Sequence, residues 1–409
     1  MNIESRDLGG YVYWVEGGGN SFLYAPFKQL AAFDWRAALI KRVIGYIPNN
    51  LEIPAIPPLP VTATLDCTHS CPLECRYCSG VAGRDPNIMY FTVAETAVDI
   101  IIANGKQTGY QPTLVFGAGG EPLMAWQLLK RIVNYARAKA KATGMELKVV
   151  MTTCGAVPAE RISWAVQNID DIVLSFDGPA EIQNAQRPFA NGRPSFETVD
   201  ATARQLFQLN ATFSIRATIT RNNINIAQLV KFFSQYQPRF INVQPLSKCG
   251  RCLTGDCYDS LAVTPEEFVA QFITAQRTSD IPLVFPGVDI GRITPVSCHA
   301  YNNTGMVVTN WGLLSACERV LSADDPLAGQ FIYGQVVDGT IQTKTNQINT
   351  VDEIPLCHNC FMRWHCQGQC HHDRLAETGD RLGKYAHGCQ IVRQIGWHLL
   401  YNRRKRKEV

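Results

Sequence analysis

The sequence lacks an apolar run close to the roughly 18 residues that a membrane-spanning helix needs. Its first residues, MNIESRDLGG, also lack the basic and then apolar pattern of a secretory signal peptide. Charge is sparse and balanced, with 38 Lys+Arg against 35 Asp+Glu and a net charge of +3, which is too small to indicate a nucleic-acid partner. We therefore expect a cytoplasmic protein that binds neither membranes nor nucleic acids.

Cysteine is abundant, with 15 in 409 residues, while 46% hydrophobic residues give the chain a globular composition. A disulfide framework does not persist in the cytosol, so the sequence predicts that these thiols bind metal. They fall into three groups, at 71–78, 249–257 and 298–389, and only Cys67 and Cys154 stand apart.

The chain divides by its composition into five predicted parts. The first is β-rich, with short strands around Gly17–Gly19 and a helix near 34–43, and a proline-rich linker follows it. The parts are a β-rich segment at 1–47, a linker at 48–60, an alternating α/β region at 61–286, a cysteine-rich domain at 287–396 and a basic tail at 397–409.

Short β-branched runs alternate with helical-period segments in the third part. The predicted strands are 61–66, 113–117, 146–152, 171–176, 212–219 and 239–245, and the predicted helices are 92–104, 124–142, 158–168, 195–209, 225–236 and 265–277. Capping boxes are expected at Thr92/Glu95 and Thr264/Glu267, and helix ends at Gly105 and Gly144. Such alternation produces a parallel sheet, and six units predict a partial (β/α)6 barrel of the α/β class.

The loop after the first predicted strand contains CPLECRYC, residues 71–78, which places Cys71, Cys75 and Cys78 on one turn of chain. Three thiolates satisfy three irons of a [4Fe–4S] cube and leave the fourth iron for a substrate or cofactor. The alternatives are a zinc site, which usually has paired two-residue spacings, or unrelated buried cysteines.

This loop resembles the CxxxCxxC motif of the radical S-adenosylmethionine (radical SAM) superfamily. The resemblance implies that the open iron binds SAM, and that one electron cleaves SAM to a 5′-deoxyadenosyl radical that abstracts hydrogen from a substrate. It also implies a set of SAM contacts, in which Glu121 holds the methionine ammonium and Tyr77 packs near the adenine. The expected contacts are Tyr77, Gly119, Gly120, Glu121, Pro122, Ser175, Asp177 and Arg216.

The last third resembles the SPASM extension of that superfamily, with seven cysteines in the expected order, although a zinc ribbon is an alternative for part of it. The resemblance implies two auxiliary [4Fe–4S] clusters. One would be held by Cys357, Cys360, Cys366 and Cys389, and the other by Cys298, Cys317 and Cys370 with no fourth cysteine just upstream. Cys249, Cys252 and Cys257 then have three open roles: an extra cluster ligand, a separate site or substrate-handling thiols, or no function.

Superfamily members with this extension mainly modify polypeptides, and the N-terminal segment favours a maturase of ribosomally made peptides. The expected reaction is an oxidative cross-link, either thioether, C–C or C–O, with Glu318 as a candidate base. Expected partners are a precursor peptide, an electron donor of flavodoxin or ferredoxin type, and a separate leader-peptide-binding protein. The alternatives are a formylglycine-forming sulfatase activator, an Fe–S electron carrier in which Cys67 completes the first cluster, or a zinc scaffold.

Overall fold

A computed structural model describes residues 1–28, 30–32, 57–80, 86–253, 257–294, 298, 304–344, 350–383 and 386–407. The helix predicted near 34–43 and most of the proline-rich linker lie outside these ranges. No helix in the described part of the chain is both long and apolar enough to span a membrane.

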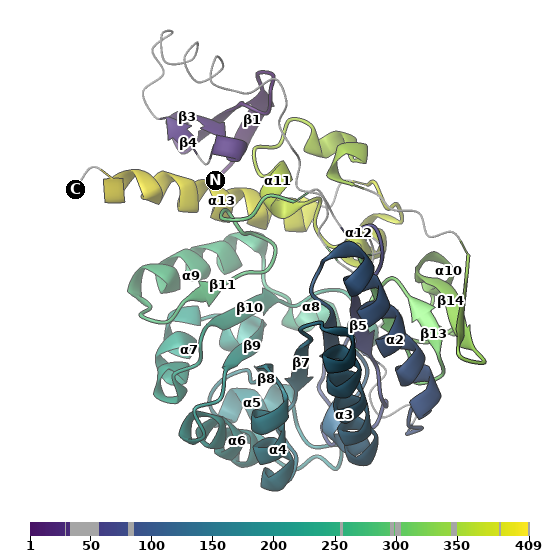
Figure 1. Cartoon of the computed structure of the whole chain (residues 1–409). Coiled ribbons are helices and arrows are strands. Elements are labelled where there is room, and N and C mark those ends of the chain that lie inside the picture. The colour runs from purple at the N-terminus through teal and green to yellow at the C-terminus, as the bar shows by residue number, and fades with distance from the viewer. Residues whose placement is uncertain are drawn as a thin grey trace.

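All six predicted barrel strands are confirmed, and they pair in parallel in the order in which they occur in the chain. They are β5 (Thr62–Leu65), β6 (Thr113–Phe116), β7 (Lys148–Thr153), β8 (Asp171–Ser175), β9 (Phe213–Ile219) and β10 (Ile241–Pro245). The helices between them lie along the outside of the sheet, as Figure 1 shows. They are α2 (Phe91–Thr108), α3 (Trp126–Thr143), α4 (Ala159–Asn168), α5 (Ala180–Gln186), α6 (Phe196–Gln208), α7 (Ile226–Phe233) and, after β10 and the short α8 (Cys257–Leu261), α9 (Pro265–Thr278).

Two of the predicted helix signals are confirmed and two are wrong. Thr264 and Glu267 form the capping box of α9, and Gly144 ends α3 with φ 72°. Helix α2 instead begins at Phe91 without a side-chain cap and ends at Gly109, so neither Thr92 nor Gly105 marks a boundary. Gly105 is needed inside the helix for another reason, since a Cβ there would lie 2.7 Å from Cγ of Pro112.

The sheet extends beyond the six strands at both edges. The short β11 (Leu283–Val284) pairs in parallel with β10, and β12 (Gly305–Val308) pairs in parallel with β5. Strands β13 (Leu313–Ser315), β14 (Ile332–Val337) and β15 (Thr340–Thr343) then follow in antiparallel order. The region after residue 287 therefore continues the barrel sheet next to the cysteine loop, which the strand pattern did not predict.

The N-terminal segment folds as a separate antiparallel sheet of β1 (Ile3–Asp7), β2 (Tyr13–Gly17), β3 (Asn20–Ala25) and β4 (Leu30–Ala32). Two of these strands were predicted, and Gly18 and Gly19 form the hairpin turn with positive φ at both residues. The sheet packs on the C-terminal part of the chain: the Phe22 and Trp397 rings are 4.8 Å apart, and Tyr24 Oη lies 2.6 Å from His365 Nε2. Figure 1 shows the sheet beside α13 (Ala386–Lys407) rather than on the barrel.

Candidate active site

The cysteine loop leaves the carboxyl end of β5 and is fixed by backbone hydrogen bonds on two sides. On one side, the amide groups of Gly120 and Glu121 donate to the carbonyl oxygens of Thr68 and Ser70 at 2.9 and 2.8 Å. On the other, the amides at positions 74 and 76 donate to the carbonyls at positions 188 and 186, at 2.8 and 3.0 Å. The loop therefore has one conformation imposed by the loops after β6 and after α5.

Gly120 has no space for a side chain, because a Cβ there would overlap the carbonyl oxygens of Ser70 and Thr68. We predict that Gly120→Ala pushes the cysteine loop outward, costs about 1–3 kcal/mol of stability through overpacking, and lowers iron incorporation at that loop. Melting temperature and iron content measure both effects. Gly329→Ala is the matched control, since nothing lies within 4 Å of its Cβ position. Wild-type iron content and melting temperature in the Gly120 variant would contradict this role.

The three cysteines of the loop line one cavity of about 530 Å³ at the carboxyl end of the barrel strands. Most of the other predicted site residues line the same cavity: Tyr77, Gly119, Gly120, Glu121, Ser175, Arg216, Cys298, Cys317, Glu318 and Cys370. Two of the predicted SAM contacts do not, because Pro122 is buried at the start of a 3-10 turn (Pro122–Ala125) and Asp177 is buried behind the cavity wall. The other predicted site residues outside this cavity are four cysteines of the C-terminal region, Cys357, Cys360, Cys366 and Cys389. The donor set fits a cluster with an adjacent SAM molecule, since three thiols, a buried carboxylate and a guanidinium face one space.

Cys154 lies in this cavity as well, although the sequence pattern left it without a role. A hydrogen bond between the Cys154 and Cys71 side chains lowers the pKa of Cys71 and raises that of Cys154. This favours the thiolate at Cys71, which is the form that binds metal. The sequence could have indicated this position, because Cys154 directly follows β7 and residues that follow barrel strands lie at the carboxyl end of the barrel.

Glu121 is 1% exposed, and protein donors already surround its carboxylate. Thr153 Oγ1 donates to it at 2.9 Å, the amide of Cys154 at 2.6 Å and the amide of Leu123 at 3.1 Å. Burial raises the pKa of Glu121, while these bonds favour its charged form. The carboxylate is therefore held in one position at the cavity wall.

Arg216 and Glu318 face the cavity from β9 and from the loop after β13. Arg216 Nη2 donates to Gln244 Oε1 at 2.6 Å, and burial lowers its pKa. Glu318 Oε1 accepts from Thr64 Oγ1 at 3.1 Å. The guanidinium of Arg216 and the carboxylate of Glu318 thus line the same cavity as the cysteines, and this pair of charges suits a zwitterionic ligand.

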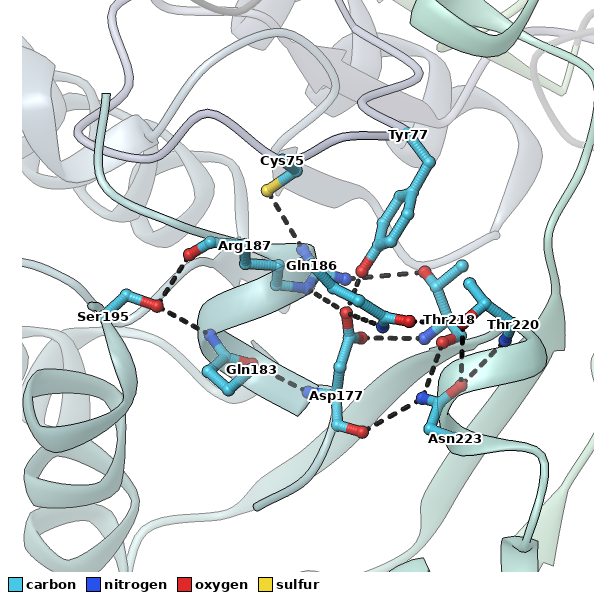
Figure 2. A network of polar contacts seen from close by, with 10 residues as sticks. All are labelled: Cys75, Tyr77, Asp177, Gln183, Gln186, Arg187, Ser195, Thr218, Thr220 and Asn223. Atoms are coloured by element: carbon cyan, nitrogen blue, oxygen red, sulfur yellow. Dashed lines mark hydrogen bonds and ion pairs between the residues drawn. The ribbon is translucent and has the colours of Figure 1, made fainter. Parts of the chain in front are cut away.

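Asp177, predicted to contact SAM, instead organises a network within the protein, shown in Figure 2. Its carboxylate accepts from Tyr77 Oη, from Gln186 Nε2 at 2.8 Å, from Arg187 Nε at 2.9 Å and from the amide of Thr218 at 2.9 Å. The carboxylate is fully buried, so its visible role is to fix Tyr77 and Arg187 beside the cysteine loop.

The C-terminal cysteines influence one another electrostatically within two groups. Burial raises the pKa of Cys317, and the charges of Cys370 and Cys298 raise it further. Desolvation of the half-buried Cys366 also raises its pKa, and the charges of Cys389, Cys360 and Cys357 add to that effect. Within the described ranges, no three His, Cys, Asp or Glu side chains converge closely enough to hold a single metal ion.

The three cysteines in the loop after β10 differ in their bonding. Cys252 and Cys257 form a disulfide, whereas Cys249 is a buried free thiol that lines the main cavity. The loop packs on the first cysteine motif, because the amide of Arg251 donates to the carbonyl of Cys78 at 3.0 Å. Cys67 is buried but does not line the cavity, which leaves it away from the proposed cluster ligands.

Residues 65–233 match the family model described as Radical SAM superfamily. The matched range contains the cysteine loop and strands β6 to β9, so this part of the chain is similar to radical SAM domains, as the motif predicted. An uncharacterized protein of Methanocaldococcus jannaschii is 28% identical over 183 residues, which cover 44% of this chain and 60% of that protein. The chain thus spans about three fifths of the length of the curated relative that it matches.

Two groups of solved structures share the fold over most of the chain. The structure of anSMEcpe with bound S-adenosylmethionine and the Cp18Cys peptide is 18% identical, with a TM-score of 0.65 over 84% of this chain and 99% of that one. Streptococcus suis SuiB bound to the precursor peptide SuiA is 16% identical, with a TM-score of 0.55 over 95% of this chain and 98% of that one. The likeness extends past the barrel, so the fold of the C-terminal region also has counterparts in these two structures.

Proposed function

We propose that this chain is a radical SAM enzyme that installs an oxidative cross-link in a ribosomally made precursor peptide. The observation that carries the proposal is the meeting of three elements at one cavity: the cysteine loop, the glycine-rich loop with Glu121, and cysteines of the C-terminal region. The fold likeness to SuiB, whose structure holds the precursor peptide SuiA, supports a peptide as the substrate.

The proposed binding roles follow from the cavity wall. Cys71, Cys75 and Cys78 would hold a [4Fe–4S] cluster, and the SAM molecule would lie along Gly119 and Gly120 with Glu121 at its ammonium and Arg216 at its carboxylate. Ser175 and Tyr77 complete that wall. When bound, SAM and the cluster supply a 5′-deoxyadenosyl radical, while these side chains orient SAM and exclude water.

Glu318 is the proposed base for the proton that an oxidised substrate must release. Its carboxylate lies in the cavity and accepts a hydrogen bond from Thr64 Oγ1. A general base must stand within hydrogen-bond reach of its proton donor. Among the described residues that line this cavity, the other carboxylate is Glu121, which is assigned to the SAM ammonium. Cross-linking removes two hydrogens from the peptide, one to the deoxyadenosyl group and one as a proton and an electron.

Two auxiliary [4Fe–4S] clusters, on the two C-terminal cysteine sets, are the proposed acceptors of that electron. The first set faces the main cavity directly through Cys298, Cys317 and Cys370. A second cavity of about 530 Å³ shares several of its wall residues and extends toward α12 (His371–Thr378) and α13. Together the two cavities offer an extended path, which fits a polypeptide better than a small metabolite.

The second candidate is a sulfatase activator that converts a peptide Cys or Ser to formylglycine. The higher TM-score of anSMEcpe, 0.65 against 0.55 for SuiB, favours it. The four-stranded N-terminal sheet, which packs on the C-terminal region, favours the maturase instead, because a maturase commonly carries an additional segment before its barrel.

Tandem mass spectrometry of treated peptides separates the two functions. We predict that a short peptide encoded beside this gene loses two hydrogens and no longer fragments between two of its residues, because a cross-link joins them. Formylglycine made from serine also lacks two hydrogens, but its aldehyde reacts with a hydrazide probe and leaves fragmentation intact. If a peptide with a sulfatase motif becomes reactive toward the hydrazide while the peptides encoded beside this gene stay unmodified, the result contradicts the maturase and supports the sulfatase activator.

A further inference from the structure

Arg187 follows α5 and places its guanidinium between the cysteine loop and a buried carboxylate, as Figure 2 shows. Nη1 lies 3.6 Å from Cys75 Sγ, within hydrogen-bond range for sulfur, and Nε donates to Asp177 Oδ2 at 2.9 Å. Nη2 is 3.5 Å from Thr218 Oγ1, and the guanidinium carbon lies 5.2 Å from the centre of the Tyr77 ring. The guanidinium therefore contacts a thiol, a carboxylate, a hydroxyl group and an aromatic ring.

The position of this guanidinium is fixed from several directions. The carbonyls at positions 186 and 188, on either side of Arg187, accept amide hydrogen bonds from the cysteine loop. The Arg187 carbonyl accepts from Ser195 Oγ at 2.6 Å, and Asp177 is held by Gln186 and Thr218. The backbones around Cys75 and Arg187 are thus joined by the same short ladder of hydrogen bonds, and the contact with Asp177 then orients the guanidinium.

The ion pair is buried, with Arg187 8% exposed and Asp177 0% exposed. An arginine guanidinium is charged at any ordinary pH, and here it pairs with the Asp177 carboxylate at 2.9 Å. The cation contacts both Cys75 and Asp177, and so it stands between the sulfur and the carboxylate. Any cluster ligated by Cys75 would therefore experience a nearby positive charge that a more distant negative charge only partly offsets.

We propose that Arg187 is a positioning residue that raises the reduction potential of the [4Fe–4S] cluster on Cys71, Cys75 and Cys78 through its hydrogen bond to Cys75. Reduction adds one electron to the cluster, and hydrogen bonds to cluster sulfurs and nearby positive charge stabilise the more negative state. Asp177 has two effects, since it orients the guanidinium and partly cancels its charge. This inference rests on the ligand assignment of the proposed function.

Opposite substitutions in the ion pair should shift the potential in opposite directions. Arg187→Gln removes the cation and leaves Asp177, so we expect the equilibrium constant for cluster reduction to fall about tenfold, or about 59 mV for one electron. Asp177→Asn removes the anion and leaves the cation, so we expect a higher potential than in the wild type. Arg187→Lys keeps the charge and should recover part of the loss.

The test is an anaerobic redox titration of the reconstituted full-length protein, followed by electron paramagnetic resonance, with dithionite as the one-electron reductant. The signal to follow is the one that changes when SAM is added, which separates this cluster from auxiliary clusters. Arg204→Gln is the matched control, because Arg204 forms an exposed pair with Asp200 at 2.8 Å on α6. The control should have the wild-type potential.

A lowered potential in Arg187→Gln with a raised one in Asp177→Asn supports the proposal. Potentials that equal the wild type, or that fall in both variants, overturn it, because a purely structural pair gives no shift of opposite sign. If Arg187→Gln does not bind iron, the reduction potentials of Asp177→Asn and Arg187→Lys decide the question. A raised potential in Asp177→Asn supports the proposal, and a potential equal to or below that of the wild type overturns it. Failure of the ligand assignment itself is distinct, since the wild type would then show no cluster signal that responds to SAM.

Discussion

Replacing Cys71, Cys75 and Cys78 together with alanine should reduce the formation of 5′-deoxyadenosine from SAM to background in dithionite-reduced protein. These three thiols line the cavity beside the glycine-rich loop, Glu121 and Arg216, whereas Cys298, Cys317 and Cys370 line it from the C-terminal region. Cys154 contacts Cys71 but supplies a single ligand, which does not hold a cube. Liquid chromatography of anaerobic reactions measures the nucleoside directly.

Cys67→Ala is the control for this variant, because Cys67 is a buried cysteine of the same loop that does not line the cavity. It should retain both its iron and its 5′-deoxyadenosine formation. A triple variant that still produces the nucleoside would show that SAM is cleaved elsewhere. Loss of activity in Cys67→Ala with loss of about four irons would make Cys67 a fourth ligand and revive the electron carrier.

Replacing Cys366 with alanine should lower the iron content from about twelve to about eight per chain and cause much of the protein to aggregate. Cys366 is half-buried, and the charges of Cys389, Cys360 and Cys357 act on its thiol, as expected for ligands of one cluster. The described chain between these cysteines has two short helices, α11 (Arg363–Cys366) and α12, so we expect metal binding to contribute to its folding free energy.

The triple variant of the first cysteine loop is the matched comparison for Cys366→Ala. It loses the same number of irons but should remain soluble, since the barrel strands and helices pack through many buried apolar side chains. Iron analysis and the soluble fraction measure the two effects. Zinc in place of iron in anaerobically purified protein, with only about four irons bound, would show that the C-terminal cysteines form a zinc domain.

The sequence predicted the six barrel strands because buried parallel strands are short β-branched runs between helical periods, and this signal is local. It did not predict β11 or β12, since each gains its strand character by pairing with an existing edge of the sheet. Gly105 illustrates the same limit, because its need for a small side chain comes from Pro112, which lies beyond the helix end.

The common cavity of Cys71, Cys75 and Cys78 could be predicted, because their spacing places them on one short loop after a barrel strand. The partners of those cysteines could not be predicted, since Cys154 and Arg187 approach Cys71 and Cys75 only after the barrel folds. Asp177 lies two residues after β8, where the sequence pattern indicated a SAM contact, and its carboxylate accepts hydrogen bonds from Arg187 and Tyr77. Polar residues at strand ends divide into those that face the cavity and those that support its wall, and the one-dimensional pattern does not separate them.

The most direct test of the central claim is the product balance of the wild-type protein with SAM alone. Anaerobically reconstituted and reduced protein should form 5′-deoxyadenosine and methionine in equal amounts, and neither should form without reductant. Protein that holds about four irons at the first cysteine loop, accepts electrons and still leaves SAM intact would contradict the claim that this cavity activates SAM.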